Sequence, residues 1–245
     1  MRSHVIIAGA QRSGTTFLYQ ALDSHPDVCM ARPMRPEPKF FLRADAGARG
    51  YADYLDMHFN HAGNERVLGE KSTSYIEYEA AAVRIRKVVP EARIIMLLRD
   101  PVLRAYSNWR FSRDHGIEKL EFVAALDAEP ERTGHWDRSR YSVCPFAYAA
   151  RGEYARYIDL WTRIFPREQI LVATSESLFD GSGLADLFRR LGLADAPLPA
   201  QGRVNASGDA CEIAPDVFRR LRDRYQESNQ RLADEWHVDT APWLA

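Results

Sequence analysis

The sequence lacks several features that would place a chain in a familiar structural class. Only three of its 245 residues are cysteines, and the wide spacing of Cys29, Cys144 and Cys211 predicts neither a disulfide framework nor a metal-binding knuckle. No run of about 18 apolar residues occurs, so a membrane-spanning helix is not expected. The 33 basic and 34 acidic side chains nearly cancel, which argues against a general binder of nucleic acids or membrane surfaces. Any binding site for an anion must therefore be local.

Targeting and metal-binding patterns are also missing. The chain enters an apolar run within its first few residues, without the charged region, long apolar segment and cleavage site of a secretory leader. His25, His115 and His135 do not have the spacing of metal ligands, so no metal site is predicted. A soluble protein of the reducing cytoplasm is expected. The length and the 46% hydrophobic content fit a single domain over residues 1–245.

Short apolar runs alternate with helical patterns along the chain. The segments 4–9, 93–98 and 169–174 are nearly continuous in apolar residues, as strands buried on both faces of a parallel sheet require. Asp100 and Pro101 form a typical helix start, a capping residue followed by proline at the first helical position. The predicted fold is an α/β, P-loop-like three-layer sandwich with a central parallel sheet flanked by helices. The predicted helices cover residues 15–22, 78–89, 101–113, 153–165 and 215–236.

The stretch 114–151 fits neither pattern. It is polar, with aromatic residues scattered through it, and we expect an insertion over the active-site face that lines the acceptor site. Aromatic residues at such spacings also occur in ordinary cores, so both interpretations stay open. The aromatic residues concerned, with one from the helix before the stretch, are Trp109, Trp136, Tyr141, Phe146 and Tyr148.

The segment GAQRSGTT, residues 9–16, resembles a phosphate-binding loop between a strand and a helix. Gly9 and Gly14 have the spacing of the nucleoside-triphosphate loop, but Thr15 stands where that loop has lysine, and Arg12 supplies a cation inside the turn. Backbone amides, hydroxyls and a guanidinium together suit a tetrahedral anion. The alternative is a tight turn in which Arg12 is merely solvated. The candidate anion-binding residues are Gln11, Arg12, Ser13, Gly14, Thr15 and Thr16.

A nucleotide kinase with a degenerate loop is one alternative function. A kinase needs a lysine on the terminal phosphates, a magnesium-holding hydroxyl directly after it and an acidic residue after a strand, and only fragments of that set are present. A protein that binds the nucleotide without catalysis is a second alternative.

A second segment, residues 94–113, pairs with the first. Arg99 follows an apolar strand, and Ser107 lies two turns into the next helix, where both can reach a second phosphate. The two segments together resemble the cofactor-binding pattern of the sulfotransferases that use 3′-phosphoadenosine 5′-phosphosulfate (PAPS). The resemblance implies that the first loop holds the 5′-phosphosulfate without a metal, and that Arg99 and Ser107 hold the 3′-phosphate that remains in the product 3′,5′-ADP.

The resemblance covers most of the chain. The segment RPEPKFF, residues 35–41, is similar to the glycan-type sulfotransferases, including the heparan sulfate N- and 3-O-sulfotransferases, and implies that Glu37 is the catalytic base. The segment GEKSTSYI, residues 69–76, implies that Lys71 lies near the sulfate. More loosely, QGRVNASG, residues 201–208, implies that Gly202 and Arg203 contact the 3′-phosphate.

The residue roles that the resemblance implies are consistent with in-line sulfuryl transfer, which removes a proton on one side and neutralises developing charge on the other. Glu37 is expected to take the proton, Arg12 and Lys71 to neutralise the bridging oxygen, and Lys39 to assist at the acceptor or the sulfate. Two readings of the acidic residues compete with this one: Glu37 as a surface charge paired with Arg35 or Lys39, and Glu70 as the base. We expect Glu70 to be structural, with Lys71 as its partner.

The acceptor is not carried over from the family. Arg12 stands where many members have lysine and Lys39 where some have histidine, and a Golgi anchor like that of the glycan enzymes is not expected. The predicted acceptor is the hydroxyl or amine of a glycan, a lipid or a small natural product.

Overall fold

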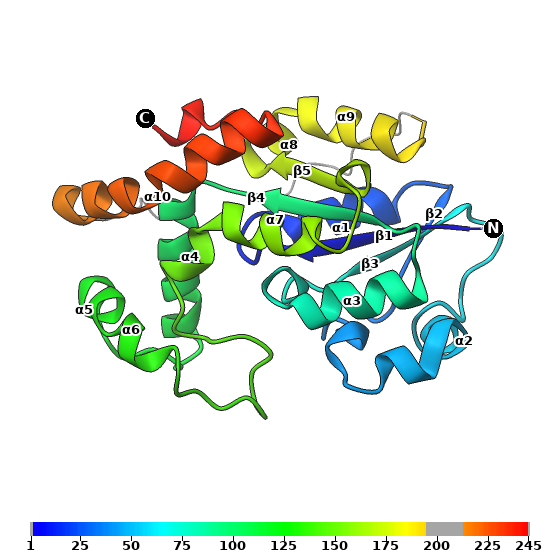
Figure 1. Cartoon of the computed structure of the whole chain (residues 1–245), viewed down its shortest axis with the longest axis horizontal. Coiled ribbons are helices and arrows are strands. Elements are labelled where there is room, and N and C mark those ends of the chain that lie inside the picture. The colour runs from blue at the N-terminus through cyan, green and yellow to red at the C-terminus, as the bar shows by residue number, and fades with distance from the viewer. Residues whose placement is uncertain (1, 195–212, 245) are drawn as a thin grey trace. The chain divides into compact units, whose positions relative to one another are not determined.

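The computed structural model describes residues 2–194 and 213–244 (Figure 1). Gly202 and Arg203 lie outside these ranges, so their predicted role stays a prediction. The chain divides into two compact units. The first unit comprises Met1–Leu98 and Ile158–Val204, and the second Arg99–Tyr157 and Asn205–Ala245. The prediction of one domain over the whole chain is not tested by this division.

The first unit is built on a five-stranded parallel sheet in the order β2-β3-β1-β4-β5. The strands are β1 Ser3–Gly9, β2 Val28–Met30, β3 Val67–Lys71, β4 Arg93–Leu98 and β5 Ile170–Thr174. Their residues are almost all buried, which is why they are apolar without alternation. The predicted parallel α/β, P-loop-like fold is confirmed.

Helices cover both faces of this sheet, with α3 in front of the strands in Figure 1 and α1 behind them. On the face of α1, Phe17, Leu18 and Leu22 join an apolar cluster with Val5 of β1 and Ile95 of β4. The helices of the first unit are α1 Thr15–Asp23, α2 Ala46–His58, α3 Glu79–Val88, α8 Ser175–Asp180 and α9 Ser182–Leu191, with short 3-10 turns η1 Phe40–Leu42, η2 Tyr75–Glu77 and η4 Arg167–Gln169.

The second unit is helical among its described residues. Its core contains Trp109, Tyr148 and Tyr225, so two of the five aromatic residues considered for the acceptor site are core residues. Asp100 caps α4 by accepting hydrogen bonds from the amides of Val102 at 2.7 Å and Leu103 at 3.2 Å, as predicted. The elements are α4 Pro101–Asp114, α5 Phe122–Asp127, α6 Glu129–Arg132, η3 Ala150–Gly152, α10 Pro215–Trp236 and η5 Ala241–Trp243, while α7 Tyr154–Thr162 crosses the boundary between units.

The predicted elements match the structure closely where the pattern was long. The predicted strands and helices are found with boundaries that differ by at most a few residues, and α10 begins and ends where predicted. β2 and β3 were missed as strands. β2 has three residues, too few for a periodic pattern, and β3 carries Glu70 and Lys71 at its end, which interrupts its apolar run.

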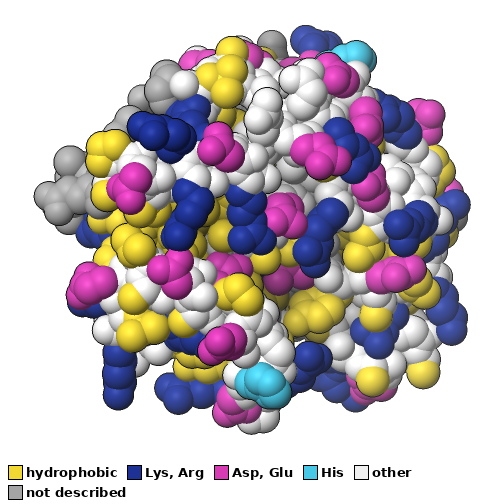
Figure 2. All heavy atoms as spheres, turned by 60° about the vertical axis from the view of Figure 1, so that its left-hand side comes forward, with side chains coloured by type: hydrophobic (Ala, Val, Ile, Leu, Met, Phe, Trp, Pro, Cys, Tyr) yellow, Lys and Arg dark blue, Asp and Glu magenta, His cyan; other side chains and the backbone are white. Residues whose placement is uncertain are grey.

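The surface carries charges of both signs. Basic and acidic side chains are interspersed over the face drawn in Figure 2, as the net charge of −1 implies. No helix within residues 2–194 and 213–244 is both long and apolar enough to span a membrane.

Gly9 ends β1 where the backbone passes Ile76 of η2. A Cβ at position 9 would lie 2.7 Å from Cγ2 of Ile76, closer than side-chain atoms approach one another. We expect Gly9→Ala to lower the free energy of unfolding by roughly 1–3 kcal/mol, because overpacking forces side chains or backbone to move. Urea unfolding measures the change.

Ile76→Gly provides the matched test, since it removes both Cγ2 and Cβ of Ile76, which the new methyl group would meet at 2.7 and 2.8 Å. In that background Gly9→Ala should cost much less than alone, giving a favourable coupling in a double-mutant cycle. Strictly additive effects would show that the methyl group is accommodated elsewhere.

Candidate functional site

The loop between β1 and α1 presents unpaired donors at the carboxyl end of the sheet. Gly14 has a left-handed backbone with φ +83°, and the amides of Gly14, Thr15 and Thr16 bond no carbonyl of the described residues. Ser13 is fully buried, and its Oγ also has no hydrogen-bond partner within the described parts of the chain. Free amides at a helix N-terminus, with an adjacent hydroxyl, form a site for an anion such as phosphate or sulfate.

Arg12 also has a left-handed backbone, with φ 70°. This conformation is uncommon for residues other than glycine, and it shows that the loop imposes its shape on the arginine. Gln11 extends from the same loop and donates from Nε2 to Oγ of Ser74 at 3.4 Å. The loop is thus connected to the segment that follows β3.

Glu37 and Lys71, separated by 34 positions, form a close ion pair. Lys71 Nζ lies 2.7 Å from Glu37 Oε1, and the two side chains are 5% and 15% exposed. Thr73 donates twice to the same carboxylate, from its amide to Oε2 at 3.0 Å and from its hydroxyl to both oxygens at 3.0 and 3.1 Å. Lys71 lies beside Ile7 in the register of β3 and β1, so the pair sits near the end of β1 that leads into the loop.

Glu70 points into the interior and is fully buried. Its Oε1 accepts from the hydroxyls of Ser72 at 2.7 Å and Tyr75 at 2.6 Å, and its Oε2 accepts from the hydroxyl of Tyr54 at 2.8 Å. Burial raises the pKa of Glu70, and these hydrogen bonds oppose the rise. Burial, together with the charge of Glu70, holds the pKa of Tyr54 and of Tyr75 well above its ordinary value, so both hydroxyls keep their protons and stay donors.

The partners of Glu70 also hold the loop that carries Glu37. Ser72 Oγ accepts a hydrogen bond from the amide of Lys39 at 2.8 Å, and the hydroxyl of Tyr75 accepts one from the amide of Phe41 at 3.0 Å. Lys39 has a left-handed backbone with φ 50° at the start of η1. The loop is thus fixed by backbone contacts to the β3 end, on either side of the buried Phe40.

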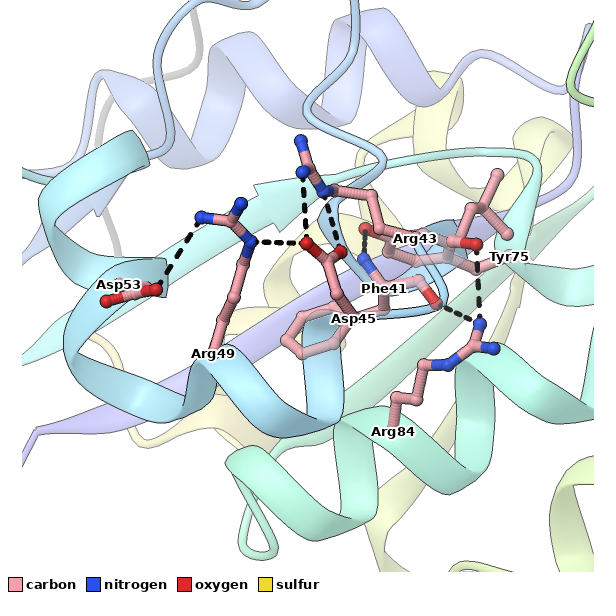
Figure 3. Close-up of polar contacts among 8 residues, drawn as sticks. Phe41, Arg43, Asp45, Arg49, Asp53, Tyr75 and Arg84 are labelled. Carbon is pink, nitrogen blue, oxygen red and sulfur yellow. Dashed lines mark hydrogen bonds and ion pairs between the residues drawn. The ribbon is translucent and has the colours of Figure 1, made fainter. Parts of the chain in front are cut away.

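Figure 3 shows how the end of this loop is supported. Arg84 of α3 donates from Nη1 to the carbonyls of Phe41 at 3.0 Å and Leu42 at 3.3 Å. A row of exposed ion pairs follows at the start of α2, each of which contributes little because the charges are solvated. The row consists of Arg43, Asp45, Arg49 and Asp53.

The second unit contains the two residues predicted to hold the 3′-phosphate. Ser107 lies on α4 and is 4% exposed, next to the equally buried Asn108. Arg99 directly follows β4, and its carbonyl accepts a hydrogen bond from the hydroxyl of Tyr154 at 2.9 Å. The backbone of Arg99 is therefore fixed within this unit.

One predicted pairing is wrong. Lys71 is the partner of Glu37 and not of Glu70, and the contacts of Glu37 with Lys71 and Thr73 do not favour the alternative in which Glu37 is a surface charge paired with Arg35 or Lys39. The side chains of Glu70 and Lys71 diverge because consecutive residues of a strand point to opposite faces of the sheet. Thr73 was missed as a site residue. The only signal in the sequence was its position two residues after Lys71.

Comparison with known proteins identifies the family. The family model described as the sulfotransferase domain matches residues 2–180. The chain belongs to the sulfotransferase family. The human bifunctional heparan sulfate N-deacetylase/N-sulfotransferase 3 is 32% identical over 181 residues, which cover 71% of this chain and 20% of that protein. The human heparan sulfate glucosamine 3-O-sulfotransferase 3B1 is 31% identical over 176 residues, which cover 71% of this chain and 41% of the relative.

Solved structures agree with this assignment. A sulfotransferase from Alicyclobacillus acidocaldarius superposes with a TM-score of 0.81 at 27% identity, over 100% of both chains. The mouse sulfotransferase SULT7A1, crystallised with PAP, has a TM-score of 0.58 at 13% identity over 93% of this chain and 84% of its own, and so shares the fold. The chain spans about a fifth of the length of the N-sulfotransferases that it matches.

The raised pKa of Glu70 predicts how the stability of the protein depends on pH. As pH rises above the ordinary value of 4.5, the unfolded chain loses the Glu70 proton before the folded chain does, so the free energy of unfolding falls. Glu70→Gln cannot titrate. Urea unfolding from pH 4 to 7 should therefore show the parent losing stability relative to Glu70→Gln as pH rises.

Glu91→Gln is the control, because Glu91 is exposed and makes no hydrogen bond or ion pair within the described part of the chain. Its stability should follow the parent at every pH. If the difference in the free energy of unfolding between the parent and Glu70→Gln were the same at every pH, this would contradict a raised pKa of Glu70.

Proposed function

We propose that this sulfotransferase transfers the sulfuryl group of PAPS to a hydroxyl or amine by in-line displacement, with 3′,5′-ADP as the leaving group. The observation that carries the proposal is the placement of the Glu37–Lys71 pair at the end of β3, beside the strand that leads into the anion-binding loop. A carboxylate and an ammonium at one edge of a parallel sheet supply a proton acceptor and a charge stabiliser for the same reaction.

The loop residues Gln11 to Thr16 fit the 5′-phosphosulfate. The unpaired amides of Gly14, Thr15 and Thr16 and the buried Oγ of Ser13 are donors without an acceptor among the described residues, as an anion site requires. In the proposal, Arg12 and Lys71 neutralise the bridging oxygen, and Lys39 assists at the acceptor or the sulfate. Arg99 and Ser107 recognise the 3′-phosphate.

The environments of the two glutamates favour Glu37 as the base. Glu70 is fully buried and accepts three hydrogen bonds from hydroxyls, so a proton from an acceptor has no path to it. Glu37 remains 15% exposed. Distinct environments of this kind separate a structural carboxylate from a reactive one.

The acceptor is proposed at the level of chemical class. The names of the relatives specify heparan sulfate, and we propose that this chain acts on a glycan, with a lipid or a small natural product as further candidates. Both sulfation of a hydroxyl and sulfation of an amine occur among the named relatives.

Binding of 3′,5′-ADP should not depend on a metal, because backbone amides and Arg12 supply the positive charge that magnesium supplies in kinases. Calorimetry with 3′,5′-ADP and with ATP, each with and without EDTA, measures this. Tight binding of 3′,5′-ADP in EDTA is expected. Magnesium-dependent binding that favours ATP would support the kinase alternative.

Arg99→Ala should weaken 3′,5′-ADP binding by on the order of tenfold or more and leave 5′-AMP binding almost unchanged, because an arginine–phosphate contact is charge-assisted. Arg219→Ala, on the exposed face of α10, is the matched control and should bind both nucleotides like the parent. Equal losses for both nucleotides in Arg99→Ala would show that Arg99 serves the fold or the other phosphate.

Glu37→Gln keeps the shape of the side chain but cannot take up the acceptor's proton. The kcat should fall by on the order of 10²–10⁴-fold while 3′,5′-ADP affinity stays near the parental value. The assay uses ³⁵S-labelled PAPS with a panel of glucosamine oligosaccharides, phenols and amines. Glu91→Gln should behave like the parent. If Glu37→Gln kept near-parental kcat and Glu70→Gln abolished it, Glu70 would be the base.

A further inference from the structure

Thr73 lies two residues beyond β3 and is directed at the carboxylate of Glu37. It is 5% exposed, and both of its hydrogen-bond donors go to that carboxylate: the amide to Oε2 at 3.0 Å, and the hydroxyl to Oε1 at 3.0 Å and Oε2 at 3.1 Å. Its amide bonds no carbonyl of the described residues, so the carboxylate replaces a backbone partner. Such a contact constrains Glu37 more than a surface hydrogen bond would.

The number of hydrogen-bond donors around Glu37 determines how many acceptor positions its carboxylate keeps open. A carboxylate offers about four acceptor positions. Lys71 Nζ, the Thr73 amide and the Thr73 hydroxyl are its donors among the described residues, and each supplies one hydrogen to it. The ammonium and the hydroxyl both reach Oε1, while Oε2 receives the amide and shares the hydroxyl. One acceptor position of the carboxylate therefore remains for a further hydrogen.

We propose that Thr73 is the positioning residue of the catalytic base, and that the remaining acceptor position of the Glu37 carboxylate takes the acceptor's proton. The inference rests on the proposed function of Glu37. The acceptor's O–H or N–H bond breaks as its oxygen or nitrogen bonds to sulfur, the proton moves to the Glu37 carboxylate, and the bridging S–O bond breaks with its electron pair leaving on the 5′-phosphate of 3′,5′-ADP. The threonine acts by fixing which oxygen faces the acceptor and by stabilising the carboxylate before it is protonated.

The lysine alone cannot fix this orientation. An ammonium on a flexible four-carbon chain is a point charge that can follow either carboxylate oxygen. The amide of Thr73 belongs to the backbone between β3 and η2, and a neighbouring amide, that of Ser72, is anchored to the carbonyl of Ile7 in β1 at 3.1 Å. Thr73 therefore holds the Glu37 carboxylate at a fixed position relative to the sheet.

Thr73→Val keeps the shape and the amide but removes the hydroxyl, and Thr73→Ser keeps both donors. We expect Thr73→Val to lower kcat by on the order of tenfold, without a change in 3′,5′-ADP affinity or in KM for PAPS, because a hydrogen bond to a charged group is lost. Thr73→Ser should restore the parental kcat, and Thr162→Val, at an exposed site on α7, should not alter it.

Comparison with Glu37→Gln separates the role of Thr73 from that of the base. An unchanged kcat in Thr73→Val, with the kcat of Glu37→Gln lowered as expected, would overturn the role of Thr73 and leave the proposed function intact. Parental activity in Glu37→Gln would overturn the proposed base itself.

Discussion

The candidate site depends on the buried carboxylate of Glu70. A carboxylate without water is costly unless hydrogen bonds satisfy it, and here three hydroxyl groups do so. Ser72 and Tyr75 each donate to Glu70 and accept an amide of the η1 loop, so the orientation of the carboxylate decides the direction of both hydroxyls. The buried Glu70 thereby fixes the loop before η1. The contact between Lys39 and Ser72, which are 33 positions apart in the sequence, depends on it. Both oxygens of the carboxylate accept at least one hydrogen bond, and buried polar networks that are satisfied in this way favour a single structure.

Glu70 and Lys71 are neighbours on β3 but lie on opposite faces of the strand. Glu70 has a structural role, and Lys71 belongs to the candidate site. Glu70 points into the interior, where three hydroxyls donate to it, and Lys71 points to Glu37 at 2.7 Å. The alternation of side chains in a strand makes this division possible within two residues. Burial then gives the two glutamates different properties: one is inaccessible and has a raised pKa, and the other keeps a position open toward its surroundings.

Backbone conformation contributes to the same region. Arg12 and Lys39 both adopt left-handed conformations, with φ 70° and φ 50°, and each lies in a loop next to the end of a strand. These conformations are uncommon outside glycine and are held by the surrounding contacts. For Lys39 the contact is the hydrogen bond from its own amide to Ser72. Positions that violate local preference therefore coincide with two of the residues proposed to act on the sulfuryl group.

The sequence by itself determined the class of the fold, the phosphate-type loop and the family, because these depend on local patterns: apolar strands, a glycine spacing and a capping aspartate. β1, β4, β5 and α10 were found where their patterns placed them. The sequence also identified Glu37 and Lys71 as candidate site residues, each from a separate motif. Only the tertiary structure decided that they pair with each other, that Glu70 turns inward, and that Thr73 holds Glu37, because these contacts join residues 34 and 36 positions apart. Such pairings are set by the register of β1 with β3 and by the path of the η1 loop, which no local pattern of residues encodes.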